Sequence, residues 1–274
     1  MRLLALGDVV ASPGRSVVRN FLPGLRKKLD IDCVVVNGDN VSHGFGMSDD
    51  GAREMFEAGA DVITCGNHFL DQRSLVPLME RDPRILRPHN MSKNIPGNGL
   101  ALLTLNDGRK VLVVHLLAQL AMPMIGDDPF DAMQNILRQY TLGANVHAII
   151  VDFHGEMTSE KMALGHFVDG KVSCLFGTHT HIPTADERIL RGGTAYQTDI
   201  GMCGVYDSVI GAEKHISVDR FVRKRSEKNR SAHGDATLCA LFVETDDTTG
   251  LAIRVEAMRI GGDLKQTSDF NTSH

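Results

Sequence analysis

Five short apolar segments of this chain each lead into side chains that can bind a metal ion. The segments cover residues 3–6, 33–36, 61–65, 148–151 and 171–176. The polar residues at their ends are Asp8, Asp39, Asn40, Asn67, His68, His154, His179 and His181. A short apolar run bounded by turn residues predicts a strand that is buried on both faces. The repeated pattern therefore points to a fold built around largely parallel, buried strands.

Helical patterns separate the apolar segments. Helices are expected over residues 13–29, 49–58, 71–81, 130–142, 158–167 and 212–222. Pro23 should kink or split the first helix, because proline cannot donate a backbone hydrogen bond. Ser48 should cap the second helix and Gly59 should end it, while Asp71 should cap the third. Alternation of strands and helices predicts βαβ units, so the fold class is α/β.

The middle of the chain departs from this alternation. The turn Asp107-Gly108 between residues 100–105 and 110–116 predicts an antiparallel hairpin. A second hairpin is expected from residues 236–243 and 251–258, so the sheets should be mixed. The sequence contains no repeat, linker or convincing boundary. Residues 1–264 are therefore expected to form a single domain, with a frayed C-terminal tail over residues 265–274.

The composition argues against several classes of protein. The 274 residues are 42% hydrophobic and 23% charged, as in an ordinary globular protein. The formal net charge of −5 argues against a protein whose main role is to bind long nucleic acids. The five cysteines lack CxxC spacing, which favours reduced, buried thiols. The apolar start ends at Asp8, too early for a signal peptide, and no run reaches the roughly 20 apolar residues of a membrane span. A cytoplasmic location is expected.

The polar residues at the strand ends predict a metal centre. Ligand sites of open α/β sheets lie beyond the carboxyl ends of the strands. His179 and His181 are one residue apart, and in an extended segment their side chains would point the same way. Carboxylate, amide and imidazole ligands together favour Mn, Fe or Zn over Ca. Seven of these residues are plausible ligands, which is too many for a single ion. They favour two ions about 3.5–4 Å apart that share a bridging carboxylate.

The ordered set of motifs resembles that of the calcineurin-like metallophosphoesterases. Residues 7–15, 63–68 and 198–202 further resemble the YmdB-type bacterial phosphodiesterases, and the similarity runs from Met1 to about Ile260. The resemblance implies a four-layer α/β/β/α sandwich with mixed sheets and a di-metal site at one end. It also implies a role for each polar residue. Asp8, Asn40 and His181 would hold one ion, Asn67, His154 and His179 the other, and Asp39 would bridge them. His68 would be the catalytic general acid or charge stabiliser.

Two positions depart from the pattern that the resemblance implies. Most of the superfamily has a histidine two residues after the first aspartate, where this chain has Val10. The YmdB-like branch also lacks that histidine, and Asn40 takes its place. That branch often has glutamate where this chain has Asp39, whose side chain is one methylene shorter. The inter-metal distance or the choice of metal is expected to differ, and the site is expected to persist.

The implied activity is hydrolysis of phosphodiesters, with 2′,3′-cyclic nucleotides favoured, through in-line attack by a hydroxide that bridges two divalent metals. Fe or Mn is the favoured metal, and Zn is the third option. Two alternatives stay open. One is a phosphomonoesterase or nucleotidase, and the other is a metal-stabilised regulatory protein with weak hydrolysis. Variable loops form the pocket walls and decide among substrates, so the sequence does not separate these alternatives.

Several residues around the core motifs have two interpretations each. His43 and Tyr206 are candidate substrate contacts, although His43 could equally be a solvated loop residue. Asp152 either fixes His154 or merely ends a strand. The basic stretch at residues 223–230 is interpreted as a solvated loop, with an RNA contact as the minor alternative. A homo-oligomer is the prior expectation, because symmetric dimers are common among soluble proteins.

Overall fold

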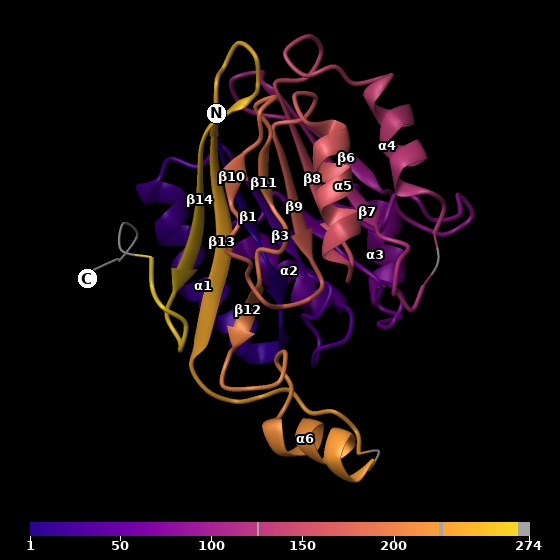
Figure 1. The fold of residues 1–274 in the computed structure, drawn as a ribbon, viewed down its shortest axis with the longest axis vertical. Coiled ribbons are helices and arrows are strands. Elements are labelled where there is room, and N and C mark those ends of the chain that lie inside the picture. Colours follow the sequence, from indigo (N-terminus) through magenta and orange to yellow (C-terminus); the bar gives the residue numbers. More distant parts are fainter. Residues whose placement is uncertain (125, 225–226, 268–274) are drawn as a thin grey trace.

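Two β-sheets packed face to face form the centre of the molecule (Figure 1). This computed structural model describes residues 1–124, 126–224 and 227–267. Strands of both sheets run as mixtures of parallel and antiparallel pairs, as predicted. Leu3, Cys33 and Val35 from one sheet pack against Val111 and Ile150 from the other. The apolar runs thus bury one face of each sheet between the sheets and the opposite face beneath helices.

The first sheet contains the N-terminal strands. Its order is β2 (Asp8–Val9), β12 (Met202–Val205), β13 (Ala236–Thr245), β1 (Arg2–Leu6), β3 (Cys33–Asn37), β4 (Val62–Thr64) and β5 (Ile85–Leu86). Strand β14 (Ala252–Ile260) pairs with β13 in the antiparallel hairpin that the sequence predicts. Strands β1, β3, β4 and β5 are parallel. The carboxyl ends of β1, β3 and β4 therefore meet at one edge.

The second sheet is assembled from the middle of the chain. Its order is β10 (Arg188–Ile189), β11 (Ala195–Gln197), β9 (Cys174–Thr178), β8 (Ala148–His154), β7 (Lys110–Leu117) and β6 (Leu100–Thr104). Strands β7, β8, β9 and β11 are parallel. Strand β6 joins β7 in the predicted antiparallel hairpin.

Helices cover the outer face of each sheet and complete four layers. The helices are α1 (Ala11–Lys28), α2 (Asp49–Ala58), α3 (Leu75–Arg81), α4 (Pro129–Leu137), α5 (Thr158–Val168) and α6 (Lys214–Arg223). Apolar side chains of α1, α2 and α3 share a core with the first sheet, and those of α4 and α5 share one with the second. This arrangement confirms the α/β/β/α sandwich. Helix α6 projects from one end of the molecule (Figure 1).

Several predicted helix boundaries are correct, among them both ends of α2, the start of α5 at Thr158 and the end of α3 at Arg81, and others are wrong. The Ser48 hydroxyl accepts a hydrogen bond from the Gly51 N–H at 3.2 Å, and Gly59 ends α2 with φ 113°. Helix α1 runs through Pro23 without ending, because its buried face, including Leu22 and Leu25, packs on the sheet. Helix α3 begins only at Leu75. Helix α4 ends at residue 137 and α6 begins at residue 214, so both are shorter than predicted.

The remaining expectations concern the cysteines, the tail and membranes. All five cysteines are free and buried, as predicted. In the expected tail, the Gln266 side chain accepts from the Gly261 N–H at 2.7 Å, and Thr267 accepts from the Arg259 N–H at 3.1 Å. Residues 268–274 lie outside the described part. Across the described ranges, none of the helices is long and apolar enough to cross a bilayer.

Candidate metal centre

The predicted polar residues gather where the two sheets meet at their carboxyl ends. Asp39 and Asn40 follow β3, Asn67 follows β4, and His154 is the last residue of β8. Asp8 follows β1, while His179 and His181 follow β9. The Asn37 side chain donates a hydrogen bond across the sheet interface to Asp152 Oδ2 at 2.9 Å. The site therefore forms only when the two sheets pack together.

The first group of predicted ligands surrounds His154. Its Nε2 lies 3.1 Å from Asn67 Oδ1, 3.3 Å from Asp39 Oδ2 and 3.2 Å from His179 Nδ1. These atoms come from three different strand ends. Ligands held about 2.0–2.2 Å from one ion lie roughly 3 Å apart. The spacing around His154 therefore matches that of ligands sharing one cation.

A hydrogen-bond chain fixes the tautomer of His154. Burial acts to raise the pKa of Asp152, but His115, His154 and the Thr64 hydroxyl together outweigh it and lower the pKa to about 2, so this carboxylate is ionised. The Thr178 hydroxyl donates its single proton to Asp152 Oδ1 at 2.7 Å. It must then accept from His154 Nδ1, which lies 2.9 Å away. The Nε2 lone pair therefore faces the oxygens of Asn67 and Asp39, an arrangement that favours a cation.

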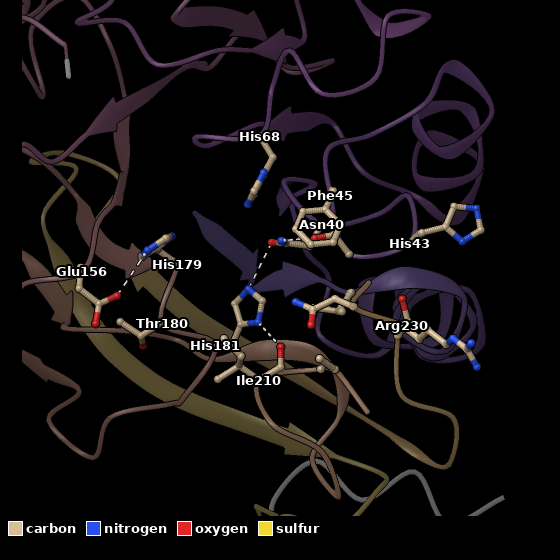
Figure 2. A pocket seen from close by; sticks show the side chains of 16 residues that line it. Asn40, His43, Phe45, His68, Glu156, His179, Thr180, His181, Ile210 and Arg230 are labelled. Atoms are coloured by element: carbon tan, nitrogen blue, oxygen red, sulfur yellow. Dashed lines mark hydrogen bonds and ion pairs between the residues drawn. The ribbon is translucent and has the colours of Figure 1, made fainter. Parts of the chain in front are cut away.

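The second group of predicted ligands pairs Asn40 with His181. The Asn40 amide nitrogen donates to the Gly44 carbonyl at 2.9 Å, which turns Oδ1 toward His181 Nε2 at 3.2 Å. His181 Nδ1 donates to the Ile210 carbonyl at 2.8 Å (Figure 2). Burial lowers the pKa of His181, so the ring is neutral and Nε2 carries a lone pair. Two acceptors again face each other, and a cation between them would resolve the repulsion.

Two buried carboxylate oxygens strengthen this interpretation. Among the described residues, Asp8 Oδ1 and Asp39 Oδ2 have no hydrogen-bond partner. Leaving such atoms unpaired costs free energy. Burial and the nearby Asp199 raise the pKa of Asp8 well above its usual range. The residues fit divalent cations, which would satisfy both oxygens.

The predicted ligand set includes two asparagines, Asn40 and Asn67. A bound cation would replace the direct contacts between the predicted ligands. Within the described ranges, no group of three or more His, Cys, Asp or Glu side chains alone is arranged so that it could hold a metal ion. Asn40 and Asn67 contribute the amide oxygens of the two groups. Gly66 is required beside them, because a Cβ there would lie 2.3 Å from His154 Nε2.

His179 and His181 do not lie in an extended segment. Strand β9 ends at Thr178, and both histidines have positive φ, 97° and 67°. The expectation that they point the same way because of strand alternation is therefore wrong. The left-handed backbone instead sends His179 to His154 and His181 to Asn40. Positive φ is uncommon outside glycine, and it often marks functional sites.

His68 lies at the entrance to the site. Its Nδ1 contacts Asp71 Oδ2 at 2.7 Å, and its ring meets Phe45 edge-on, with centroids 5.3 Å apart. Asp71, predicted as a helix cap, therefore orients this histidine. The His68 N–H donates to Asp39 Oδ1 at 3.0 Å, which links His68 to the ligand set. Figure 2 shows the ring pointing into the space near Asn40 and His181.

A cavity of about 290 Å³ opens onto this centre. Asn40, His68, His179 and His181 line it, whereas the other predicted ligands lie deeper. His43 lines the cavity as well. Tyr206 does not line it, because its hydroxyl donates to the His181 carbonyl at 3.1 Å and accepts from the Met202 N–H at 2.9 Å. Tyr206 thus supports the loop that carries His181.

Three contributions to the site escaped sequence reasoning. Glu156 Oε2 lies 3.4 Å from His179 Nε2 and can orient that ring. Phe45 and Arg230 line the cavity, whereas the sequence around Arg230 favours a solvated basic loop. Residues 225–226 of that stretch lie outside the described part. Only Glu156, two residues after His154, carries a local sequence signal.

The Thr178 hydroxyl offers a test of the metal-centre geometry. Thr178→Val should lower metal affinity about 10–100-fold, as losses of partners that orient metal-binding histidines do. The reason is that His154 Nδ1 would lose its acceptor and the ring its fixed tautomer. Chelator competition measures the affinity. Thr178→Ser, which keeps the hydroxyl, and Thr104→Val on the exposed edge of β6 should retain it. Equal affinity in Thr178→Val and the wild type would contradict the tautomer argument.

Comparison with known proteins shows the family of this chain. The family model described as "YmdB-like protein" matches residues 4–258. The chain belongs to the YmdB-like family. A relative from Bacillus subtilis strain 168, named 2′,3′-cyclic-nucleotide 2′-phosphodiesterase, is 37% identical over 263 residues, which cover 96% of this chain and 98% of the relative.

Two solved structures that align with this chain over nearly their whole length share its fold. A hypothetical protein from Thermus thermophilus superposes with a TM-score of 0.89 at 35% identity, covering 96% of this chain and 100% of that protein. A structure described as a novel phosphatase, from Mycoplasma pneumoniae, also gives a TM-score of 0.89 at 35% identity, with 96% and 94% coverage. The family match agrees with the resemblance seen in the sequence motifs.

Proposed function

We propose that this protein is a metal-dependent phosphodiesterase that opens 2′,3′-cyclic nucleotides. The observation that carries the proposal is that acceptor atoms face one another around His154 and His181, beneath a cavity that His68 lines. The name of the Bacillus subtilis relative supports this class of substrate. A small phosphorylated substrate suits a cavity of about 290 Å³.

The ligand sets follow from the two groups of contacts. Asn67, His154 and His179 would hold one divalent ion, Asp8, Asn40 and His181 the other, and Asp39 would serve both. The mixture of carboxylate, amide and imidazole ligands favours Fe or Mn, with Zn also accommodated. When bound, such ions make water a competent nucleophile near neutral pH and neutralise charge on the phosphoryl oxygens.

The side chains of this chain then handle orientation and protons. Water adds to phosphorus as the bond from phosphorus to one ribose oxygen breaks. The leaving oxygen takes a proton from His68, which a proton of the attacking water later restores. Asp71, 2.7 Å from His68 Nδ1, orients the ring so that Nε2 faces the cavity. General acid catalysis of this kind typically contributes 10²–10⁴-fold to the rate.

Substrate preference tests the proposal. The protein, reconstituted with Mn²⁺ or with anaerobic Fe²⁺, would be assayed on bis-p-nitrophenyl phosphate, p-nitrophenyl phosphate and 2′,3′-cyclic AMP. We expect turnover of the two diesters, with a nucleoside monophosphate as product of the cyclic one. His68→Ala should lower the rate about 100-fold or more, with little change in metal content. Preference for the monoester would support a nucleotidase instead. The absence of metal-dependent turnover on all three would favour a regulatory role.

A further inference from the structure

The cavity has an outer part that the metal centre does not use. Two segments far apart in sequence form its wall, residues 43–45 after β3 and residues 229–231 after α6. They lie side by side, because a Cβ built on Gly44 would be 3.8 Å from Ser231 Oγ. In Figure 2, His179 and Glu156 lie on one side of the cavity, and His43 and Arg230 on the other.

This outer part combines apolar surfaces with hydrogen-bond donors. Phe45, 41% exposed, and Ile210, 54% exposed, offer apolar contact area. No acceptor for the Arg230 guanidinium is found among the described residues. Ser231 Oγ is buried and has no partner in the same part of the chain. Asn229 Oδ1 accepts from Arg220 at 2.8 Å, so one of the two lone pairs of this oxygen is already used.

We propose that this outer part binds the nucleobase of the substrate, and that Arg230 selects guanine over adenine. The inference rests on the proposed function, because a 2′,3′-cyclic nucleotide carries its base and its leaving oxygen on the same ribose. The edge-on contact between Phe45 and His68 places an aromatic ring beside the group that protonates the leaving oxygen. A base next to that oxygen would meet Phe45 and Ile210.

The guanidinium of Arg230 sets the choice of base. Guanine presents two acceptors, O6 and N7, that match the paired N–H groups of arginine, whereas adenine presents a donor at N6. Asparagine would favour adenine if it offered both an acceptor and a donor. In this protein Arg220 already donates to the oxygen of Asn229, which ties that side chain to α6 and leaves Arg230 as the main group facing the base. A second phosphate would suit Arg230 alone, but it would leave the apolar surfaces of Phe45 and Ile210 without a role.

The test measures turnover and binding separately. For turnover, the ratio of kcat/KM for 2′,3′-cyclic GMP over 2′,3′-cyclic AMP would be compared in the wild type, Arg230→Ala and Lys228→Ala. For binding, calorimetry would compare guanosine and adenosine 3′-monophosphates with the metal-loaded proteins. We expect the wild type to prefer guanine about tenfold in both measurements, the lower end of what one bidentate contact supplies. Arg230→Ala should bring the preference close to one.

Lys228→Ala provides the matched control, since it removes a nearby positive charge from outside the cavity and should keep the preference. Phe45→Ala should weaken the binding of both nucleotides about tenfold. The ratio of their affinities should not change, because stacking is tolerant of base identity. Equal affinity of the wild type for the two bases would overturn the inference. So would an Arg230→Ala loss that is equal for cyclic GMP, cyclic AMP and bis-p-nitrophenyl phosphate. Guanine-selective binding without hydrolysis would overturn only the proposed function.

Discussion

Asp39→Asn is expected to abolish most metal-dependent hydrolysis while leaving the fold intact. Metal affinity should fall at least about 100-fold, because losing a mere orienting partner of a ligand already costs 10–100-fold. The carbonyl of the introduced asparagine could still accept from the His68 N–H, as Asp39 Oδ1 does at 3.0 Å. Its amide nitrogen would replace the unpaired Oδ2 and donate to His154 Nε2, now 3.3 Å from that oxygen. A neutral internal hydrogen bond would thus occupy the place of a cation.

Two measurements separate this result from simple misfolding. The metal-free Asp39→Asn protein should unfold at the same temperature as the metal-free wild type or higher, since an unpaired buried carboxylate oxygen is gone. Its metal content, measured by elemental analysis after dialysis, should drop. Asp50→Asn, at an exposed carboxylate of α2, serves as the control and should match the wild type in both. Wild-type metal content and turnover in Asp39→Asn would contradict the ligand assignment.

Lys161→Met is expected to cause the largest loss of stability, about 3–5 kcal/mol in the free energy of unfolding. Lys161 lies on α5 and is fully buried. Its Nζ donates to the Thr178 carbonyl at 2.8 Å and to Asp199 Oδ2 at 2.8 Å. Asp199 also accepts from the Thr180 and Gly201 N–H groups. Without the lysine, a buried carboxylate would lose its charge partner, and the loop carrying His179 and His181 would lose an anchor.

Denaturant unfolding of the metal-free protein measures this loss. The double variant Lys161→Met/Asp199→Asn should recover part of it, because the uncompensated charge would be removed as well. Lys171→Met removes an exposed lysine near the end of the same helix and should change the free energy of unfolding by less than about 0.5 kcal/mol. A loss below about 1 kcal/mol in Lys161→Met would mean that the buried pair does not anchor the loop.

The parts of the site that sequence could predict are those set by short segments. Each predicted ligand follows an apolar run that also forms a strand, so parallel pairing alone brings Asp39 and Asn67 to one edge. The hairpin at Asp107-Gly108 and the cap at Ser48 rest on equally local rules. These features need no knowledge of distant contacts.

The parts that could not be predicted depend on tertiary packing. The direction of His179 follows from positive φ values after β9, which nothing in the Thr-His-Thr-His sequence signals. Asp71 has the appearance of a helix cap, and only the fold reveals its contact with His68. Arg230 reaches the cavity because the chain returns through α6 to lie against the loop at Gly44. Contacts across so many residues leave no local pattern.

The most direct test of the two-metal proposal is a metal titration in which the hydrolytic activity is measured at each step. Metal-free protein would receive increasing amounts of Mn²⁺, and the initial rate of 2′,3′-cyclic AMP opening would be measured at each step. We expect no activity without metal, and a rate that rises until two ions are bound per chain and then levels off. Full activity in the chelated protein, or a rate that saturates with a single ion bound, would contradict the two-metal centre.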